Sequence, residues 1–153
     1  MADSRCLLDT NILLRWIKPD NRDYQVVTSA IEAMLLAHTV LCYTSQNVGE
    51  FWNTCTRPSE RNGYGLAPKE ADRRARFFED RLCLLPDSLA VHNEWRRMLV
   101  AHSISGVQVH DARLVAAMRV HGVKRILSFN DADFARYRDV EAVHPRALLG
   151  KHP

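Results

Sequence analysis

A short apolar run near the start of the chain, residues 5–8, stops abruptly at the carboxylate of Asp9. Two more polar residues, Thr10 and Asn11, follow it before helical spacing of apolar residues begins at 12–17. A buried strand tolerates an ionised Asp only where its carboxyl end reaches the edge of the sheet, which is where open α/β sheets place their ligands. Asp9 is therefore either the N-cap of the following helix or a member of a functional site.

The length and composition fit one ordinary globular domain. With 153 residues, of which 46% are hydrophobic and 25% charged, the chain can bury a core without disulfide or metal support, and we expect a single domain over residues 1–153. No stretch approaches the ~18 uninterrupted apolar residues of a membrane span. The first residues lack the basic-then-apolar pattern of a signal peptide. We therefore expect a cytoplasmic protein without membrane association.

The cysteine spacing argues against zinc or redox chemistry, and the basic residues weakly favour one class of substrate. The four cysteines form no C-x-x-C pair for zinc or redox chemistry, and we expect buried free thiols at Cys6, Cys42, Cys55 and Cys83. The net charge is only +3, but most basic residues are Arg, with Lys only at 18, 69, 124 and 151. Because the Arg guanidinium suits phosphate and base recognition, this bias weakly favours a nucleic-acid substrate.

Helical and strand-like segments alternate along the chain. Strand-like segments lie at 5–8, 39–43, 82–85, 124–129 and 140–143, and further helical segments at 24–38, 46–56, 68–82, 89–105 and 112–121. A strand followed by two helices thus occurs three times, before two final strands. This order predicts a three-layer α/β/α sandwich around a central, largely parallel sheet.

Local signals support several of these helix boundaries. Thr44 or Ser45, and later Ser88, can cap helix N-termini by accepting free backbone N–H groups. Pro68 suits the first position of a helix. Residues 57–65 contain one Pro, two Gly and two Arg, and they form the one long predicted loop, of a kind that often carries function.

Further acidic residues occupy positions that such a sheet would bring close to Asp9. Glu50 lies in the first two turns of the helix after the second predicted strand, and Asp111 begins the last predicted helix. Asp131 and Asp133 lie in the turn after the fourth strand. Taken alone, each of these acids has an ordinary structural explanation, as a helix-surface residue, a partner of the helix dipole or a turn residue. The carboxyl ends of parallel strands share one edge, however, so the joint placement favours a common site.

Gathered carboxylates point to a particular chemistry. Without cations they repel one another and raise one another's pKa, a cost that a hard divalent cation removes. Oxygen ligands without Cys or a pair of His suit Mg²⁺ or Mn²⁺ rather than zinc. In nucleases such ions acidify water and neutralise charge on the phosphodiester, so that no nucleophilic side chain is required. The pattern therefore predicts metal-dependent phosphodiester hydrolysis.

On these residues the chain resembles the PIN-domain ribonucleases, and specifically the VapC-type toxins of toxin–antitoxin pairs. The resemblance covers nearly the whole chain. It rests on Leu7-Leu8-Asp9-Thr10-Asn11, on Glu50, on Asp111-Ala112 with the alanine-rich residues 114–117, on Ile126-Leu127-Ser128-Phe129-Asn130 leading to Asp133-Phe134, and on the loop 56–66.

The resemblance implies roles for individual residues. Asp9, Glu50 and Asp111 match the family's first three acids, which hold one or two Mg²⁺ or Mn²⁺ ions that activate the attacking water. Thr10 or Ser128 can assist by hydrogen bonding.

The fourth acid departs from the family pattern. In many members it lies two residues after the strand's Thr or Ser, where this chain has Asn130. An amide donates and accepts hydrogen bonds but carries no charge. Asp131 and Asp133 stand beside it, and we expect Asp133 to supply the remaining carboxylate.

The resemblance also implies partners. It predicts an RNA substrate, a VapB-type antitoxin whose carboxyl-terminal segment covers the acidic cleft, and a homodimer, for which helices 24–38 and 46–56 are expected to expose apolar residues. We expect four arginines to hold RNA phosphates: Arg57, Arg61, Arg73 and Arg113. The predicted function is a Mg²⁺-dependent endoribonuclease, the toxin component of a type II toxin–antitoxin system. The alternative is a non-catalytic RNA- or partner-binding regulatory module of the same fold.

Two other hydrolase classes share single features with this sequence but lack others that they require. The pair His110-Asp111 is also found in metal-dependent phosphohydrolases, for which His92, His102 and Asp139 could supply further ligands, but that fold is all-helical and this chain has strand-like segments. Haloacid-dehalogenase-like phosphatases would use Asp9 as a covalent nucleophile. They need an acid two residues later as proton donor, where this chain has Asn11.

Overall fold

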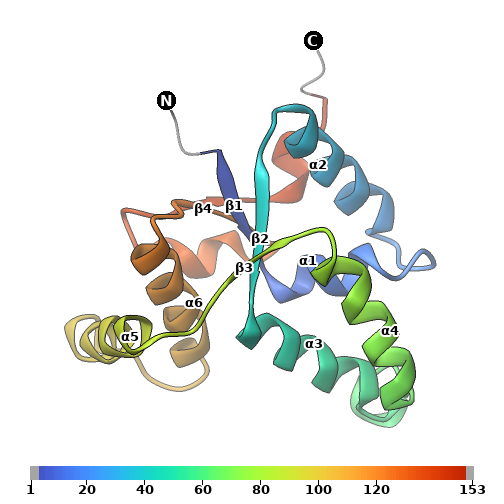
Figure 1. Cartoon of the computed structure of the whole chain (residues 1–153), viewed down its shortest axis with the longest axis horizontal. Coiled ribbons are helices and arrows are strands. Elements are labelled where there is room, and N and C mark those ends of the chain that lie inside the picture. Colours follow the sequence, from blue (N-terminus) through green and yellow to red (C-terminus); the bar gives the residue numbers. More distant parts are fainter. Residues whose placement is uncertain (1–3, 151–153) are drawn as a thin grey trace.

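Five short strands form one parallel sheet in the computed structural model, which describes residues 4–150 (Figure 1). The strands are β1 (Arg5–Leu8), β2 (Val40–Thr44), β3 (Cys83–Leu85), β4 (Arg125–Leu127) and β5 (Glu141–Val143). Their order across the sheet is β3-β2-β1-β4-β5, and every neighbouring pair is parallel. All five strands therefore end at the same edge, with β1 at the centre.

The helices follow the predicted order. They are α1 (Thr10–Trp16), α2 (Tyr24–Leu36), α3 (Ser45–Thr56), α4 (Pro68–Glu79), α5 (Leu89–Ala101) and α6 (Gln108–His121), with short 3₁₀ turns η1 (Ser59–Arg61), η2 (Asp131–Phe134) and η3 (Pro145–Leu148). Two boundaries differ from expectation. Helix α5 ends at Ala101 rather than near residue 105, and α6 begins at Gln108 rather than at residue 112.

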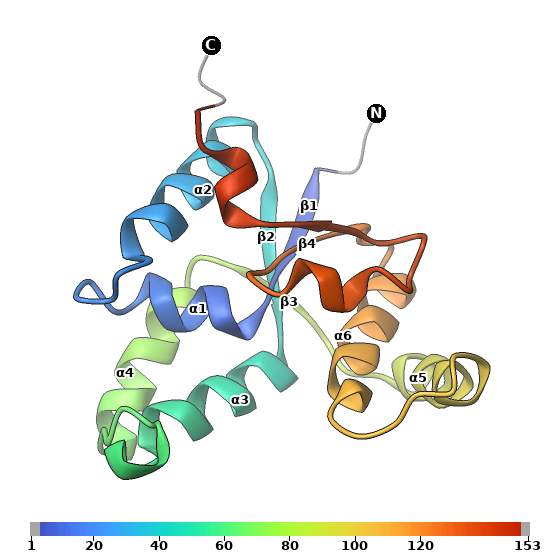
Figure 2. The same ribbon diagram turned by 180° about the vertical axis from the view of Figure 1, so that it is seen from behind.

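The sheet lies between two helical layers, as the predicted sandwich requires. Alternate residues of β1 point to opposite faces: Cys6 and Leu8 belong to one core cluster with α1 to α4, whereas Leu7 belongs to another with α5 and α6. Figures 1 and 2 show the same division, with α1 to α4 on one side of the strands and α5 and α6 on the other. Buried on both faces, β1 reads as an uninterrupted apolar run.

Caps and turns fix where the helices begin. Thr44 accepts a hydrogen bond from Asn47 N and forms a capping box with that residue, and Ser88 accepts one from Val91 N. Pro68 occupies the first turn of α4, as predicted. Gly122 ends α6 with a φ of 72°, a left-handed conformation that glycine adopts without strain.

Two expectations about exposure need correction. Cys6, Cys42 and Cys55 are buried free thiols as expected, but Cys83 is exposed because it lies on the edge strand β3. Within α3, all of which the structure describes, Phe51 and Cys55 turn inward and no large apolar side chain is fully exposed. Of the two helices expected to offer an apolar surface, only α2 does so, through Leu35 and Leu36.

No helix among residues 4–150 combines the length and apolarity needed to cross a bilayer.

Candidate active site

Asp9 lies at the central point of the edge where the strands end. It is the N-cap of α1, with Oδ1 accepting a 2.8 Å hydrogen bond from Thr10 N. Its Oδ2 accepts a 2.7 Å hydrogen bond from the hydroxyl of Ser128 at the end of β4. The side chain of Asn11 donates a longer one, of 3.4 Å, to the same oxygen. Asp9 is only 7% exposed, so both sequence interpretations hold at once: it caps a helix and it is a buried carboxylate at the ligand edge.

Glu50 is connected to the end of β1 through Thr10. Thr10 Oγ1 donates a 2.7 Å hydrogen bond to Glu50 Oε1 and accepts one of 3.1 Å from Asn47 Nδ2. Asn47 is fully buried, and its Oδ1 accepts from the backbone N–H of Thr44 at the end of β2. This chain of contacts fixes the first turns of α3, and with them Glu50, beside the end of β1.

Asp111 approaches from the opposite helical layer. Gln46 Nε2 of α3 donates a 2.9 Å hydrogen bond to the backbone oxygen of His110 and a 3.4 Å one to Glu50 Oε2, which brings the start of α6 to the start of α3. Burial raises the pKa of Asp111 from 3.8 to about 7, with further increases from the negative charges of Asp9, Asp133 and Glu50.

The pKa of Asp9 is also raised, and burial is again the main cause. Hydrogen bonds from Ser128 and Thr10 oppose the increase because they stabilise the ionised form. The charges of Glu50 and Asp133 add to it. Asp9, Glu50, Asp111 and Asp133 therefore form one electrostatically coupled group, which we call the acidic cluster.

The turn η2 places Asp133 in this cluster. The backbone N–H of Asn130 donates a 2.9 Å hydrogen bond to Ser128 Oγ, and that of Asp133 donates one of 2.9 Å to the Asn130 carbonyl. Asp131 precedes Asp133 in the turn but is not among the charges that raise the pKa of Asp111. Asp133, which we expect to be the fourth acid, is thus the acid of this turn whose charge acts on Asp9 and Asp111.

Among the residues that the structure describes, no Lys or Arg forms an ion pair with the acidic cluster. Among residues 4–150, the ion pairs of Lys and Arg involve other acids: Asp20, Asp23, Glu70, Asp72, Asp87, Glu94 and Asp139. Nor do any three His, Cys, Asp or Glu side chains in this part of the chain lie close enough together to hold a metal ion as they stand. The cluster has the oxygen donors that suit a hard cation, but its side chains are not in a coordinating arrangement.

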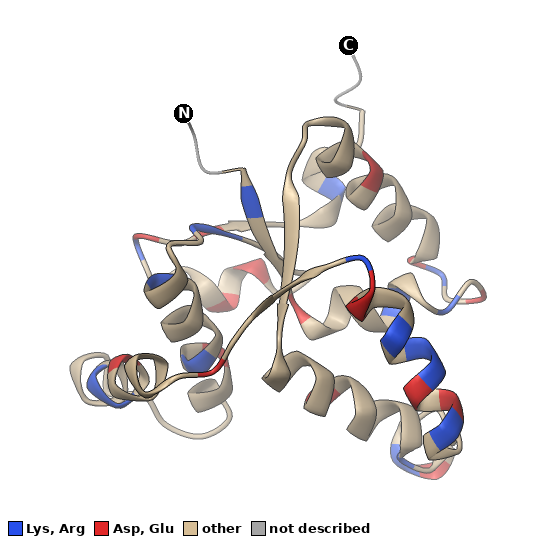
Figure 3. Cartoon of the chain, in the orientation of Figure 1, with Lys and Arg blue, Asp and Glu red and all other residues tan. Residues whose placement is uncertain are grey.

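The four arginines expected to bind RNA are dispersed. Arg57 donates to the Asn62 carbonyl within the long loop, and Arg73 forms an ion pair with Glu70 on α4. Arg61 is exposed in η1. Only Arg113 lies on the helix that carries Asp111. In Figure 3 the Lys and Arg segments are concentrated along α4 and around α5 and α6, on both sides of the central strands.

Three residues of the site were given no role in it from the sequence: Asn11, which was noted only as part of the motif around Asp9, and Gln46 and Asn47. Asn11 contacts Ser128 Oγ at 3.3 Å and accepts a hydrogen bond from Phe129 N at 3.2 Å. Asn47 stands three residues after Thr44, where the capping-box signature has Glu or Gln, so the sequence carries only a partial signal for it. Nothing in the sequence indicates that Gln46 reaches α6.

Sequence comparison identifies the family. The family model for the PIN domain matches residues 6–140, and the chain therefore belongs to the PIN domain family. A search of curated protein sequences finds no match.

Solved structures with the same fold come from bacterial toxin–antitoxin complexes and toxins. The crystal structure of DNA-bound VapBC from Salmonella typhimurium contains a chain with a TM-score of 0.66 and 17% identity, covering 92% of this chain and 98% of that one. A chain of VapBC2 from Rickettsia felis, bound to a DNA fragment from its promoter, has a TM-score of 0.65 and 16% identity, with the same coverage. VapC20 of Mycobacterium tuberculosis, a toxin that cleaves the sarcin-ricin loop, has a TM-score of 0.63 and 16% identity, covering 86% of this chain and 95% of that one. At these identities the likeness establishes the fold.

Proposed function

We propose that this PIN domain is a Mg²⁺-dependent endoribonuclease and the toxin component of a type II toxin–antitoxin system. One observation carries the nuclease proposal. The acidic cluster couples four carboxylates electrostatically, from the end of β1, from α3, from α6 and from η2; the pKa of two of them is raised, and none has a cationic partner among the described residues. A fold gains no stability from such repulsion, so the arrangement calls for a cationic ligand.

Oxygen ligands alone favour Mg²⁺ or Mn²⁺ over softer metals. We propose Asp9, Asp111 and Glu50 as the residues that hold one or two such ions, with Asp133 as the fourth acid. A bound ion would offset the repulsion, lower the pKa of a water molecule and neutralise charge on the scissile phosphodiester.

The remaining tasks fall to the protein's own side chains. Ser128 and the backbone of Thr10 hold Asp9 in one orientation, and the Thr10 hydroxyl does the same for Glu50. Glu50 accepts hydrogen bonds from both the Thr10 hydroxyl and the Gln46 amide, and these contacts restrict its side chain to one region beside the end of β1. Asp133 is exposed in the turn η2.

The VapBC complexes with this fold support a VapB-type antitoxin as partner, and the VapC20 toxin supports an RNA substrate. We propose both for this chain, acting in the cytoplasm. We also propose a homodimer, for which α2 offers Leu35 and Leu36, exposed to 54% and 75%. Light scattering of the purified chain tests the dimer: a monomer that persists at high protein concentration would contradict it.

The nuclease proposal is tested by incubating the purified chain with a mixed RNA pool. We expect endonucleolytic cleavage with MgCl₂ or MnCl₂, none in EDTA, and recovery when the metal is added back. RNA that is bound but left intact in Mg²⁺ would contradict the proposal and select the alternative, a non-catalytic RNA-binding module. Hydrolysis of simple phosphomonoesters with RNA left intact would also contradict it.

A further inference from the structure

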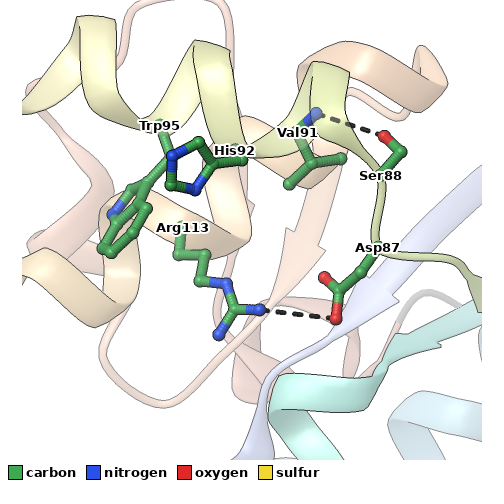
Figure 4. A pocket seen from close by; sticks show the side chains of 6 residues that line it. All are labelled: Asp87, Ser88, Val91, His92, Trp95 and Arg113. Carbon is green, nitrogen blue, oxygen red and sulfur yellow. Dashed lines mark hydrogen bonds and ion pairs between the residues drawn. The ribbon is translucent and has the colours of Figure 1, made fainter.

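A cavity outside the acidic cluster lies between α5, α6 and the segment that follows β3. It has a volume of about 410 Å³ and is lined by Asp87, Ser88, Val91, His92, Trp95 and Arg113 (Figure 4). The lining comes from the segment after β3, from the first turns of α5 and from α6. None of these residues belongs to the acidic cluster, so the cavity needs an explanation of its own.

The cavity and the acidic cluster lie on different sides of the start of α6. Gln46 of α3 donates to the His110 carbonyl, and Trp95 Nε1 of α5 donates a 2.9 Å hydrogen bond to the carbonyl of the preceding residue, Val109. Asp111 and Arg113 are two residues apart, so they project from different faces of the helix. The cavity is therefore adjacent to the acidic cluster, with the first turns of α6 between them.

The lining combines ring faces with a paired acid and base. The His92 and Trp95 rings stand edge to face, with centroids 6.0 Å apart. Arg113 reaches from α6 to Asp87, with 3.3 Å between Nη2 and Oδ2, and its guanidinium lies 5.9 Å from the Trp95 ring. Proteins bind unpaired bases by stacking them on aromatic side chains and contacting their edges with polar groups. This cavity supplies both kinds of contact.

The Asp87–Arg113 pair can open for a ligand at small cost. The two side chains are 48% and 40% exposed, and ion pairs at such exposure contribute little to the stability of a protein. A base that satisfies both partners would therefore compete well with their mutual contact. The edge of such a base must carry a hydrogen-bond acceptor for the Arg113 guanidinium next to donors for the Asp87 carboxylate.

We propose that this cavity binds one unpaired guanine of the RNA substrate, an inference that rests on the proposed ribonuclease function. Guanine presents O6 as an acceptor for Arg113, and beside it N1–H and the 2-amino group as two donors for the carboxylate of Asp87. Adenine and uracil each place only one donor on this edge. Among the bases, guanine also combines two adjacent donors with a purine-sized ring for the aromatic wall.

The test uses nucleotide binding in EDTA, so that it does not depend on catalysis. The Trp95 indole N–H signal, assigned by a Trp95→Phe variant, is followed by NMR during titration with GMP and with IMP, which lacks the 2-amino group. We expect GMP to shift this signal and to bind about tenfold more tightly than IMP. Asp87→Asn should remove the difference, whereas Asp139→Asn, which alters an exposed acid paired with Arg119 elsewhere on α6, should retain it.

Three results would overturn the proposal: no binding of GMP, equal binding of GMP and IMP to the wild type, or tighter binding of AMP, CMP or UMP than of GMP. Its failure is distinguishable from failure of the ribonuclease function. A chain that cleaves RNA in Mg²⁺ but does not select GMP retains its nuclease activity without this subsite. A chain that selects GMP but cleaves no RNA retains the subsite and loses the proposed activity.

Discussion

Ser128 Oγ donates a 2.7 Å hydrogen bond to Asp9 Oδ2, so that two residues 119 positions apart in the sequence join the ends of two neighbouring strands. The same hydroxyl oxygen accepts a hydrogen bond from the backbone N–H of Asn130. One side chain thus orients the central carboxylate and also anchors the turn that carries Asp133.

Replacing this hydroxyl should weaken both connections. In Ser128→Ala the buried Asp9 loses a hydrogen bond that stabilises its ionised form, and the Asn130 N–H loses its acceptor. We expect a loss of about 1 to 3 kcal/mol in the free energy of unfolding at pH 8, measured by urea denaturation. The exposed Ser45→Ala serves as control and should change stability by less than about 0.5 kcal/mol. Equal stability of the two variants would contradict the role given to Ser128.

Asp111 should destabilise the metal-free protein at high pH. Its pKa is about 7 in the folded state, against ~3.9 in an unfolded chain, so the folded state holds the proton more tightly. The contribution of Asp111 to stability is therefore fully present below about pH 4 and is lost as the pH rises to about 7.

In EDTA, Asp111→Asn should consequently match the wild type near pH 4 and exceed it at pH 8. Because the side chain is partly exposed, solvent screening reduces the expected gain to about 1 kcal/mol. Urea denaturation across this pH range measures it. The comparison variant is Asp139→Asn: Arg119 lowers the pKa of Asp139, so this variant should lose stability at pH 8. A stability difference between Asp111→Asn and the wild type that does not vary with pH would contradict the assigned shift.

Metal binding should reverse the same repulsion. At a free Mg²⁺ or Mn²⁺ concentration about a hundredfold above the Kd, we expect stabilisation of about 2.7 kcal/mol, seen as a Tm increase of roughly 5 to 10 °C. Asp133→Asn should reduce this increase because a charge of the acidic cluster is lost. Asp131→Asn removes the same charge from the same turn outside the cluster and should leave it unchanged. If Asp131→Asn reduced the increase more than Asp133→Asn, the fourth acid would be misassigned.

Much of the fold could be predicted because its signals are local. The apolar run before Asp9 marks the central strand, and Ser88 and Pro68 mark helix starts at their observed positions. The helix boundary at Gln108 was missed because polar residues open α6 before its apolar face begins. The exposure of Cys83 was also missed, since it depends on the position of β3 at the sheet edge, which no segment specifies alone.

The acids of the site could be predicted for a topological reason. Residues that follow parallel strands meet at one edge whatever the details of packing. Contacts that depend on side-chain reach were not predictable in this way. Gln46 of α3 reaches the backbone of α6, and Arg113 of α6 pairs with Asp87 in the segment between β3 and α5. Such pairs are set by how the helical layers pack, which the sequence pattern does not specify residue by residue.

Asp9→Asn shows whether the acidic cluster is the site of RNA cleavage. Asn caps helices as well as Asp does and can still accept from Thr10 N, so the variant should fold normally, which circular dichroism can verify. The measurement is the rate of RNA cleavage in Mg²⁺ by wild type, Asp9→Asn and the control Asp139→Asn. We predict a fall of at least about 1,000-fold for Asp9→Asn, or roughly 4 kcal/mol of transition-state stabilisation, and little change for the control. A folded Asp9→Asn variant that cleaves RNA as fast as the wild type would contradict the account.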